Sequence, residues 1–463
     1  MDINLKKKSA AVKKLFIHLI ITAIFVFLSG CSTISETFPF LNDLTQSFTA
    51  KSTEQPIKNP VNALTTVQPS MAVTSISETA GATTATPEPT PSIYSIQLWV
   101  PPQFDIEQDS QAGEAFAEVI SSYMEEHPNI NITVRVKAVS GDGSMLNTVT
   151  AANQIAKDAL PSLAIMSHSD METCVQRNIL QPIETGVFSD TGTWFNYAKQ
   201  SAVSDNNAYA IPLFGDALVI AYRNSKIGAD LGDWQDILGR GLPIDFTPAA
   251  ANSTFGPFMY LSMGGQLIND QGQPFLDQQK LLDTLNFFLV GSQNGSFPPS
   301  IAQLADQNQA WQKFNDGTYS IIVTPFSSFR HYQTSEISVR SLPLQVNSTE
   351  YPMINTWNLV MLEDNPVIQN EVIKFAEYLS DVTINNNLSF SAGYLPVRNG
   401  TPDDISEESE YDLVRMICEN GVLVPHNAVY NKTIPVLNNA VTQVIKGQAS
   451  PEDAAKDAVA SLN

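Results

Sequence analysis

Cysteine, positive charge and long apolar runs are all scarce in this chain. Its 463 residues include only three cysteines, Cys31, Cys174 and Cys418, which are too few for a disulfide framework. Lysine and arginine total 25 against 47 aspartates and glutamates, so the net charge is −22. Because nucleic-acid binding needs a basic surface, this balance argues against a nucleic-acid partner. Beyond Cys31, no apolar run approaches the roughly 20 residues of a membrane-spanning helix.

The sequence also lacks the common signatures of catalytic and metal sites. Residues 105–109 (Asp-x-Glu-x-Asp) begin like a calcium loop, but Ser110 and Phe116 stand where such a loop needs glycine and glutamate. The nearest approach to Gly-x-Ser-x-Gly is the loop-like Ser-Gly-Asp-Gly-Ser at 140–144. We therefore expect no cofactor, no metal ion and no catalytic residue. The histidines are scattered, without His-x-x-x-His spacing: His18, His127, His168, His331 and His426.

The first 31 residues predict export. Five lysines, between Lys6 and Lys14, precede an apolar run at 15–28 that is too short for a comfortable bilayer span. The run ends in Leu-Ser-Gly-Cys, which resembles the bacterial lipobox, where a peptidase cuts before the cysteine and the thiol carries a diacylglyceryl group. We expect a signal peptide at 1–30 and a lipid anchor on Cys31; the alternative is an uncleaved anchor with an incidental cysteine. Cleavage removes five lysines and one aspartate, so the net charge of −22 becomes −26.

Residues 31–93 have the composition of a tether. Ser, Thr, Pro, Ala and Gln dominate the part from 47 to 92, which includes Thr-Pro-Glu-Pro-Thr-Pro at 86–91. Such a segment buries too little apolar surface to offset the entropy lost on ordering. Stretched at about 3.1 Å per residue, it reaches well over ~100 Å. We expect it to hold the remainder of the chain clear of the membrane.

From residue 94 onward, strand and helix patterns alternate. This part of the chain is long for a single core and suggests two domains. The order strand, helix, strand, helix, strand predicts a largely parallel sheet with helices on both faces. The segments in this first group are 95–100, 111–127, 130–139, 145–160, 162–166 and 172–177.

A second group of elements starts near Tyr222. Pro451 follows Ser450 and stands at a first helical position, which predicts that a helix begins there. No internal repeat is present. The expected helices are 234–238, 251–263, 278–291, 301–314, 365–379 and further helices from 407, with strands at 319–323 and 358–362.

Short motifs between residues 94 and 462 occur in a set order. They are Ile-Gln-Leu-Trp at 96–99, Asp-Ala-Leu-Pro-Ser at 158–162, Asn-Ile-Leu-Gln-Pro-Ile at 178–183, Ala-Tyr-Ala-Ile-Pro-Leu at 208–213, Gly-Gly at 264–265, Trp-Gln-Lys-Phe-Asn-Asp-Gly at 311–317 and Gly-Tyr-Leu-Pro-Val-Arg at 393–398. The series resembles the extracellular solute-binding proteins of ABC importers, family 1, which includes the maltose-binding type. Ser162 departs from the family's aspartate, and Arg223 splits its Tyr-Asn pair.

The resemblance implies a two-lobed α/β protein with a periplasmic-binding-protein type II-like fold, each lobe a mostly parallel sheet flanked by helices and joined by a hinge. We expect lobe one at 94–221 and about 344–385, and lobe two at 222–343 and about 386–463. A solute that contacts both lobes stabilises the closed state, which a permease recognises. The implied partners are a small solute and ABC importer permease subunits. The implied protein is a monomer, anchored outside the cytoplasm of a bacterial cell.

Aromatic and polar residues in the loops after predicted strands are the candidate ligand-binding residues, since open sheets bind ligands at strand ends. A sugar needs aromatic faces against its C–H faces and fixed groups for its hydroxyls. Each candidate also has a structural interpretation: Trp99 can cap the core, Asp170 can cap a helix, and Phe326 and Phe329 can pack inward, although Ser327 and its serine neighbour favour a loop. The candidates are Trp99, Phe104, His168, Asp170, Phe214, Asp216, Phe326, Phe329, Asn355, Trp357 and Tyr394.

Other solutes and activities stay open at the level of the sequence. Polyamines, peptides and organic anions are the rival solutes, although polyamine sites need several carboxylates and anion sites need arginine. A surface glycoside hydrolase would need two facing carboxylates, and pairs such as Glu125-Glu126 are adjacent in the sequence. The mixture of aromatic residues with Asp170, Asp216 and Asn355 favours a neutral carbohydrate.

Overall fold

The computed structural model describes residues 93–463, except 184–187, 189–192, 205, 229–230, 251–252, 344–352, 402–407, 426–430 and 463. These residues belong to one compact unit, Pro87–Asn463. The expected signal peptide, the lipidation site at Cys31 and the tether lie outside the described residues. Among the residues described, none of the helices has both the length and the apolar character needed to cross a bilayer.

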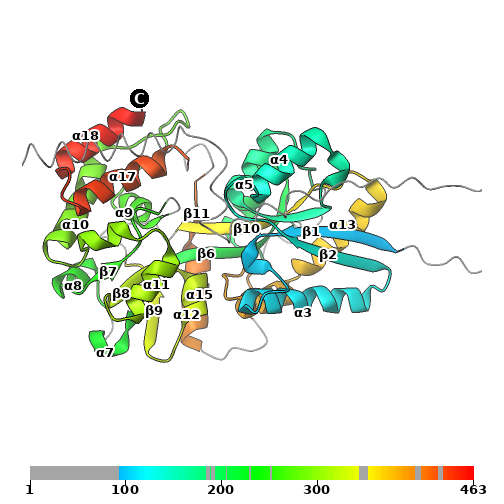
Figure 1. Cartoon of the computed structure of the whole chain (residues 1–463), viewed down its shortest axis with the longest axis horizontal. Helices are drawn as coiled ribbons and strands as arrows, with labels where there is room; N and C mark the ends of the chain where they lie inside the picture. The colour runs from blue at the N-terminus through cyan, green and yellow to red at the C-terminus, as the bar shows by residue number, and fades with distance from the viewer. Residues whose placement is uncertain are drawn as a thin grey trace, which may run out of the picture. The chain divides into compact units, whose positions relative to one another are not determined.

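A mixed sheet runs through the described part of the chain (Figure 1). Its path is β2-β1-β3-β10-β6-β8-β7, with β11 beside β10 and β9 beside β6. Strand β1 pairs parallel with β2 and β3, and β7 pairs parallel with β8, whereas β10 and β6 pair antiparallel with each other and with β3, β8 and β9. The strands are β1 Tyr94–Val100, β2 Ile130–Val136, β3 Leu163–Ser167, β6 Ala210–Arg223, β7 Ile244–Asp245, β8 Ile321–Pro325, β9 Ile337–Ser341, β10 Met353–Met361 and β11 Val422–Leu423, with a separate pair β4 Val203–Ser204 and β5 Asn207–Ala208.

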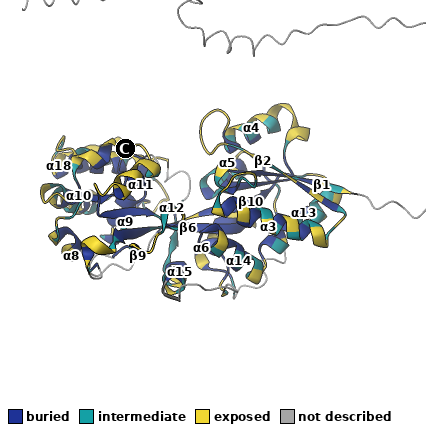
Figure 2. Cartoon of the chain, turned by 60° about the horizontal axis from the view of Figure 1, so that its bottom comes forward, coloured by how far each residue is buried: buried dark blue, intermediate teal, exposed yellow. Residues whose placement is uncertain are grey.

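The long strand β6 pairs with different strands along its two halves. Its residues up to Ala217 pair with β10, and those from Leu218 onward pair with β8 and β9. Side chains of a strand alternate between its two faces. Val219 therefore lies in one cluster of buried apolar side chains, called the first cluster, and Ile220 lies in another, called the second cluster. Figure 1 shows β6 and β10 between two groups of helices, and Figure 2 shows these strands largely buried.

The first cluster lies against β1, β3 and the first part of β6, and α3 illustrates how its helices form. Ser110 caps α3 by accepting a hydrogen bond from the Gly113 backbone N–H at 3.1 Å. Phe116, Ile120 and Tyr123 then recur at helical spacing and are buried. The helices on this side are α3 Gln111–Glu126, α4 Met145–Ile155, α5 His168–Gln176, α6 Asn196–Ala202, α13 Pro366–Leu379, α14 Val382–Ala392 and α15 Glu408–Asn420, with 3-10 turns at Pro102–Phe104 and Lys157–Ala159.

The second cluster packs around β7 and the last part of β6. Helix α18 begins at Pro451, as predicted, and Ser450 Oγ accepts a hydrogen bond from the Asp453 backbone N–H at 3.1 Å. The helices that follow β6 in the sequence and precede β10 are α7 Asn224–Ile227, α8 Trp234–Gly239, α9 Phe255–Ser262, α10 Gln278–Gln293, α11 Gln307–Asn315 and α12 Phe326–Tyr332, with a 3-10 turn at Pro299–Gln303. Helices α17 Thr433–Ile445 and α18 Pro451–Leu462 return to this cluster from the end of the sequence.

The packing after β10 differs from the expected grouping of 386–463. Leu388 of α14 and Cys418 of α15 are buried in the first cluster, whereas Leu437 of α17 lies in the second. Residues after 385 stay with the first cluster because α14 packs against α3 and β11 pairs with β10. The chain therefore passes to the second cluster only after β11. Cys174 and Cys418 are buried free thiols.

Candidate ligand-binding site

Two neighbouring cavities lie where β3, β6 and β10 come together. The larger has a volume of about 530 Å³ and is bounded by the end of β3, the start of α5 and the middle of β10. The smaller has a volume of about 220 Å³ and lies beside Asp216 to Leu218, where β6 changes its pairing partners. Ser167, Asn355, Thr356 and Trp357 line both cavities.

His168 and Asp170, both predicted site residues, lie at the wall of the larger cavity. Strand β3 ends at Ser167, whose Oγ caps α5 by accepting from the Asp170 backbone N–H at 3.2 Å. Ser167 is therefore the N-cap, and Asp170 lies within the first turn. Burial raises the pKa of the Asp170 carboxyl, and a hydrogen bond from the Ser167 side chain partly opposes this. His168 Nδ1 lies 3.2 Å from the carbonyl oxygen of Ser201.

Asn355 and Trp357 project from β10, the strand that separates β3 from β6. The prediction placed Trp357 just before a strand at 358–362, but β10 already begins at Met353, so Trp357 lies inside it. Residues two apart share a face of a strand, which brings Asn355 and Trp357 to the same cavities. Trp357 pairs with Ser167 of β3 and Phe214 of β6.

Asp216 lines the smaller cavity and also holds α12 in place. Its Oδ1 accepts from the Ser327 backbone N–H at 3.1 Å, and its Oδ2 accepts from Ser327 Oγ at 2.6 Å. Burial raises the pKa of Asp216 to about 6, although these hydrogen bonds lower it. The prediction of a loop at Ser327 was wrong, because the capped segment Phe326–Tyr332 is helical.

Known proteins can now be compared with this arrangement. The model of the family described as bacterial extracellular solute-binding protein matches residues 107–382. The chain belongs to this family. No curated protein sequence matches the chain.

Solved structures with the same fold include proteins described as sugar-binding or as bound to maltose or ribitol. Maltose-bound MalE3 of T. maritima has a TM-score of 0.66 and 14% identity, covering 80% of this chain and 98% of its own. The sugar-binding protein MalE of Xanthomonas citri gives 0.64 and 16%, covering 79% and 95%. An ABC transporter solute-binding protein of Agrobacterium radiobacter, in complex with ribitol, gives 0.62 and 15%, covering 80% and 98%. The predicted two-lobed α/β fold is confirmed.

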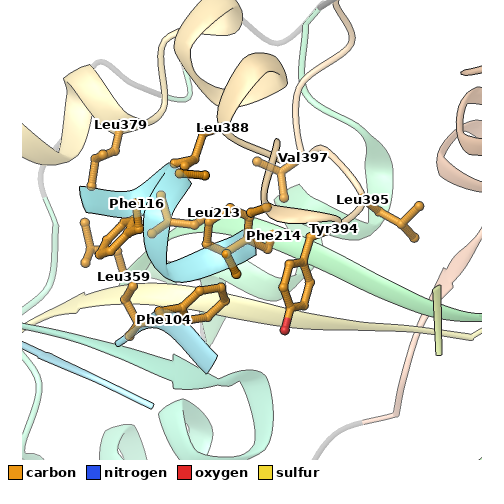
Figure 3. Close-up of a cluster of buried hydrophobic side chains, with 14 of the residues drawn as sticks. Phe104, Phe116, Leu213, Phe214, Leu359, Leu379, Leu388, Tyr394, Leu395 and Val397 are labelled. Carbon is orange, nitrogen blue, oxygen red and sulfur yellow. The ribbon is translucent and has the colours of Figure 1, made fainter. Parts of the chain in front are cut away.

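Most of the predicted aromatic site residues of this solute-binding protein are in the interior and do not line either cavity. Phe104 stacks on Phe214 at 4.8 Å between ring centroids, and Tyr394 lies 5.4 Å from Phe214 (Figure 3). Phe104 also meets the Trp357 ring edge-to-face at 6.0 Å. The buried rings therefore support the position of Trp357. The six interior residues are Trp99, Phe104, Phe214, Phe326, Phe329 and Tyr394.

Trp99, Phe326 and Phe329 each have a local packing partner. Lys137 Nζ lies 4.2 Å from the centre of the Trp99 ring, and Trp99 belongs to a third buried cluster with Met145. The Phe326 and Phe329 rings lie 6.2 Å apart on α12 and are both buried. These contacts match the structural interpretation that the sequence left open for each residue.

Several polar residues of the smaller cavity were not among the predicted candidates. Thr247, Ser253, Thr254 and Gln307 come from the segment after β7, the start of α9 and the start of α11. Thr247 Oγ1 accepts from Gln307 Nε2 at 2.9 Å. A strand-end rule does not find three of these residues, because Ser253 and Thr254 precede α9 and Gln307 begins α11. Among the described residues, no group of three or more His, Cys, Asp or Glu side chains is placed to hold a metal ion.

Proposed function

We propose that this chain captures a carbohydrate in the two cavities and delivers it to an ABC importer. The observation that carries the proposal is the half-buried Trp357 ring, which lines both cavities among hydroxyl, amide and carboxyl groups. An aromatic face with a few fixed polar groups suits a sugar ring. Related folds that bind maltose and ribitol support this choice.

The proposal includes the two lobes and the anchor. We place lobe one at 94–217 and 353–425, and lobe two at 218–343 and 431–463, because β6 changes its pairing partners after Ala217 and α17 and α18 pack in the second cluster. Buried side chains of α11 and α12, such as Trp311 and Phe326, pack in the first cluster from across this boundary. The lipobox-like motif supports a lipid on Cys31, with the tether between the membrane and the binding unit. A protein that binds and releases its solute unchanged needs no catalytic pair, and we propose no enzymatic activity.

A polyamine is the second candidate solute. Asp170 and Asp216 line the cavities, and neither lysine nor arginine occurs among the described residues that line them. This acidic lining suits a cation and disfavours an organic anion. A neutral sugar is favoured over a polyamine because hydroxyl and amide groups outnumber the carboxylates and because Trp357 is central.

The test is a thermal-shift screen of the full chain, purified in a detergent without a sugar headgroup, against saccharides, spermidine, amino acids and peptides. A ligand at a hundredfold excess over its Kd adds about 2.7 kcal/mol of apparent stability. We expect an upward shift with one class of saccharide. We expect Trp357→Ala to weaken that binding at least tenfold and Trp357→Phe, which keeps a ring, to retain most of it.

The outcomes separate the candidates. A shift with spermidine and none with any saccharide would replace the carbohydrate proposal by the polyamine one. Saccharide binding that is unchanged in Trp357→Ala would place the site elsewhere on the protein. Release of a shorter sugar during the assay would contradict the absence of enzymatic activity.

A further inference from the structure

The two cavities share one wall and differ in the rest of their lining. Apart from Ser167, Asn355, Thr356 and Trp357, the larger is bounded mainly by residues before β6 in the sequence, such as Met145 and Met166. The smaller is bounded by residues from Asp216 to Pro325. One ligand that filled both cavities would therefore extend past Trp357 in both directions along the shared wall.

The sizes of the cavities favour more than one sugar unit. A volume of 220 Å³ corresponds to about seven water molecules at about 30 Å³ each, which is close to the space that one sugar ring fills. The larger cavity, at 530 Å³, lies within the range of about 300–1,000 Å³ typical of small-molecule sites. A single ring would occupy one cavity and leave the other to water.

The polar groups of the smaller cavity are held in a fixed network. Trp311 Nε1 donates to Thr324 Oγ1 at 3.1 Å, and Thr324 Oγ1 donates to Gln307 Oε1 at 3.2 Å. Gln307 Nε2 donates in turn to Thr247 Oγ1 at 2.9 Å. Three side chains thus fix the Gln307 amide at the cavity wall before any ligand arrives, which lowers the entropy cost of binding.

The backbone conformation of Thr247 shows that the wall of the smaller cavity is held in a specific geometry. Its φ of +46° lies in the left-handed region, which is a strained conformation for a β-branched residue. The Asp245 carboxylate supports it by accepting from the Thr247 backbone N–H at 2.9 Å. Such strain persists where the surroundings over-determine it, and it concentrates at ligand sites.

We propose that the smaller cavity is a second sugar subsite, so that the ligand is a saccharide of at least two units with Trp357 between them. This inference rests on the proposed function. Gln307 and Thr247 are the specificity-determining residues for the second unit, and His168 and Asp170 contact the first. The protein then discriminates a disaccharide from the monosaccharide of the same sugar.

The test is isothermal titration of the full chain in a detergent without a sugar headgroup. The probes are glucose, maltose and cellobiose, xylose and xylobiose, and mannose and mannobiose. We expect a disaccharide to bind at least tenfold more tightly than its own monosaccharide. Gln307→Leu removes the amide of the second subsite, and we expect it to weaken binding of the disaccharide by a factor at least ten times larger than its effect on the monosaccharide.

Asp170→Asn is the matched variant in the first subsite, and we expect it to weaken both probes alike. Should Gln307→Leu fail to fold, Thr254→Val removes a hydroxyl from the same wall with little change of shape. A monosaccharide that binds as tightly as its disaccharide would overturn the inference and leave the proposed function standing. Equal weakening of both probes by Gln307→Leu would also overturn it. Binding of no saccharide at all would overturn the proposed function and the inference together.

Discussion

At the scale of single residues, Asp245 of β7 is a buried carboxyl that lacks a full set of hydrogen-bond partners among the described residues. Its side chain is fully buried, and its Oδ1 accepts the Thr247 N–H, but its Oδ2 has no partner among the described atoms. Burial raises the pKa of this carboxyl to about 6. A group whose pKa is raised by folding is protonated more readily in the native state than in the unfolded chain.

The first prediction follows from that shift. Native Asp245 binds a proton below about pH 6, whereas the unfolded residue does so only near pH 4, so ionised Asp245 lowers the unfolding free energy as the pH rises through 6. We expect the stability of Asp245→Asn relative to the wild type to increase by about 2–3 kcal/mol between pH 4 and pH 8. Urea unfolding at the two pH values measures this difference.

Asp236→Asn is the control of opposite sign. Hydrogen bonds from Arg240 and from the Gly232 backbone lower the pKa of the exposed Asp236 carboxyl. Its contribution to stability is present above about pH 4 and is lost only at lower pH, so its replacement should be slightly more harmful at pH 8 than at pH 4. Parallel behaviour of the two variants would show that burial of Asp245 is not the cause of its effect.

Among the candidate site residues, the sequence predicted those that follow or occupy strands. His168 and Asp170 line a cavity because they follow the end of β3, whereas Trp357 lines it from the middle of β10. Thr247 was not predicted as a site residue. Threonine rarely adopts a left-handed backbone conformation, so its residue type gives no indication of the one found here. Gln307 was not predicted either, because a glutamine at the first position of a helix such as α11 does not by itself indicate a binding site.

At the scale of elements, α10 depends on a close contact inside the second cluster. A Cβ added at Gly291 would lie 2.1 Å from the Phe297 ring, which is fully buried and packs against Phe288 at 5.5 Å. Only glycine allows α10 to approach that ring. Any larger residue at this position has to displace an aromatic side chain from the core.

We therefore expect Gly291→Ala to lower the unfolding free energy by about 1–3 kcal/mol, although alanine itself favours a helix. Gly239→Ala, at the end of α8 where nothing lies within 4 Å of the added Cβ, is the control. It should leave stability unchanged or raise it by up to about 1 kcal/mol. The midpoints of urea unfolding of the two variants measure this difference. Equal midpoints would contradict the close contact between position 291 and the Phe297 ring.

The sequence predicted most elements of the first group, but after residue 343 it missed α14 and gave β10 too short a span. Helix α14 contains three consecutive asparagines, which are weak helix formers. It forms because Asp381 caps it, accepting from the Thr383 and Ile384 N–H groups, and because Leu388 is buried. The predicted strand at 358–362 left out the first five residues of β10, which begins at Met353. Asn358 is buried in β10 and accepts a hydrogen bond from Ser201 Oγ at 3.1 Å.

At the scale of the whole molecule, the number of reactive cysteine thiols can test whether Cys31 carries a lipid. Cys174 and Cys418 are at most 1% exposed, and burial raises the pKa of both to about 12. Neither forms a reactive thiolate in the native state. Cys31 is the remaining cysteine of the sequence, and acylation would remove its thiol.

We expect the full chain, isolated from bacterial membranes in detergent, to show no reactive thiol when native and two when unfolded. A Cys31→Ser variant should give the same two counts, because it also lacks the third thiol. Titration with a chromogenic disulfide measures both states. One reactive thiol in the native wild type would contradict acylation of Cys31.

The two buried clusters are completed at different times in the life of the chain. Every described member of the first cluster precedes residue 419, whereas Ala454 and Ala455 of α18 belong to the second, together with Leu281 of α10. Ribosomes and secretion channels deliver a polypeptide from its N-terminus, so the second cluster stays unfinished until α18 has emerged. A chain that stalled before α17 would carry a finished first cluster joined to exposed apolar faces of α9 and α10. Quality-control proteases and chaperones recognise such surfaces, so this order of maturation favours removal of truncated receptors before they occupy an importer.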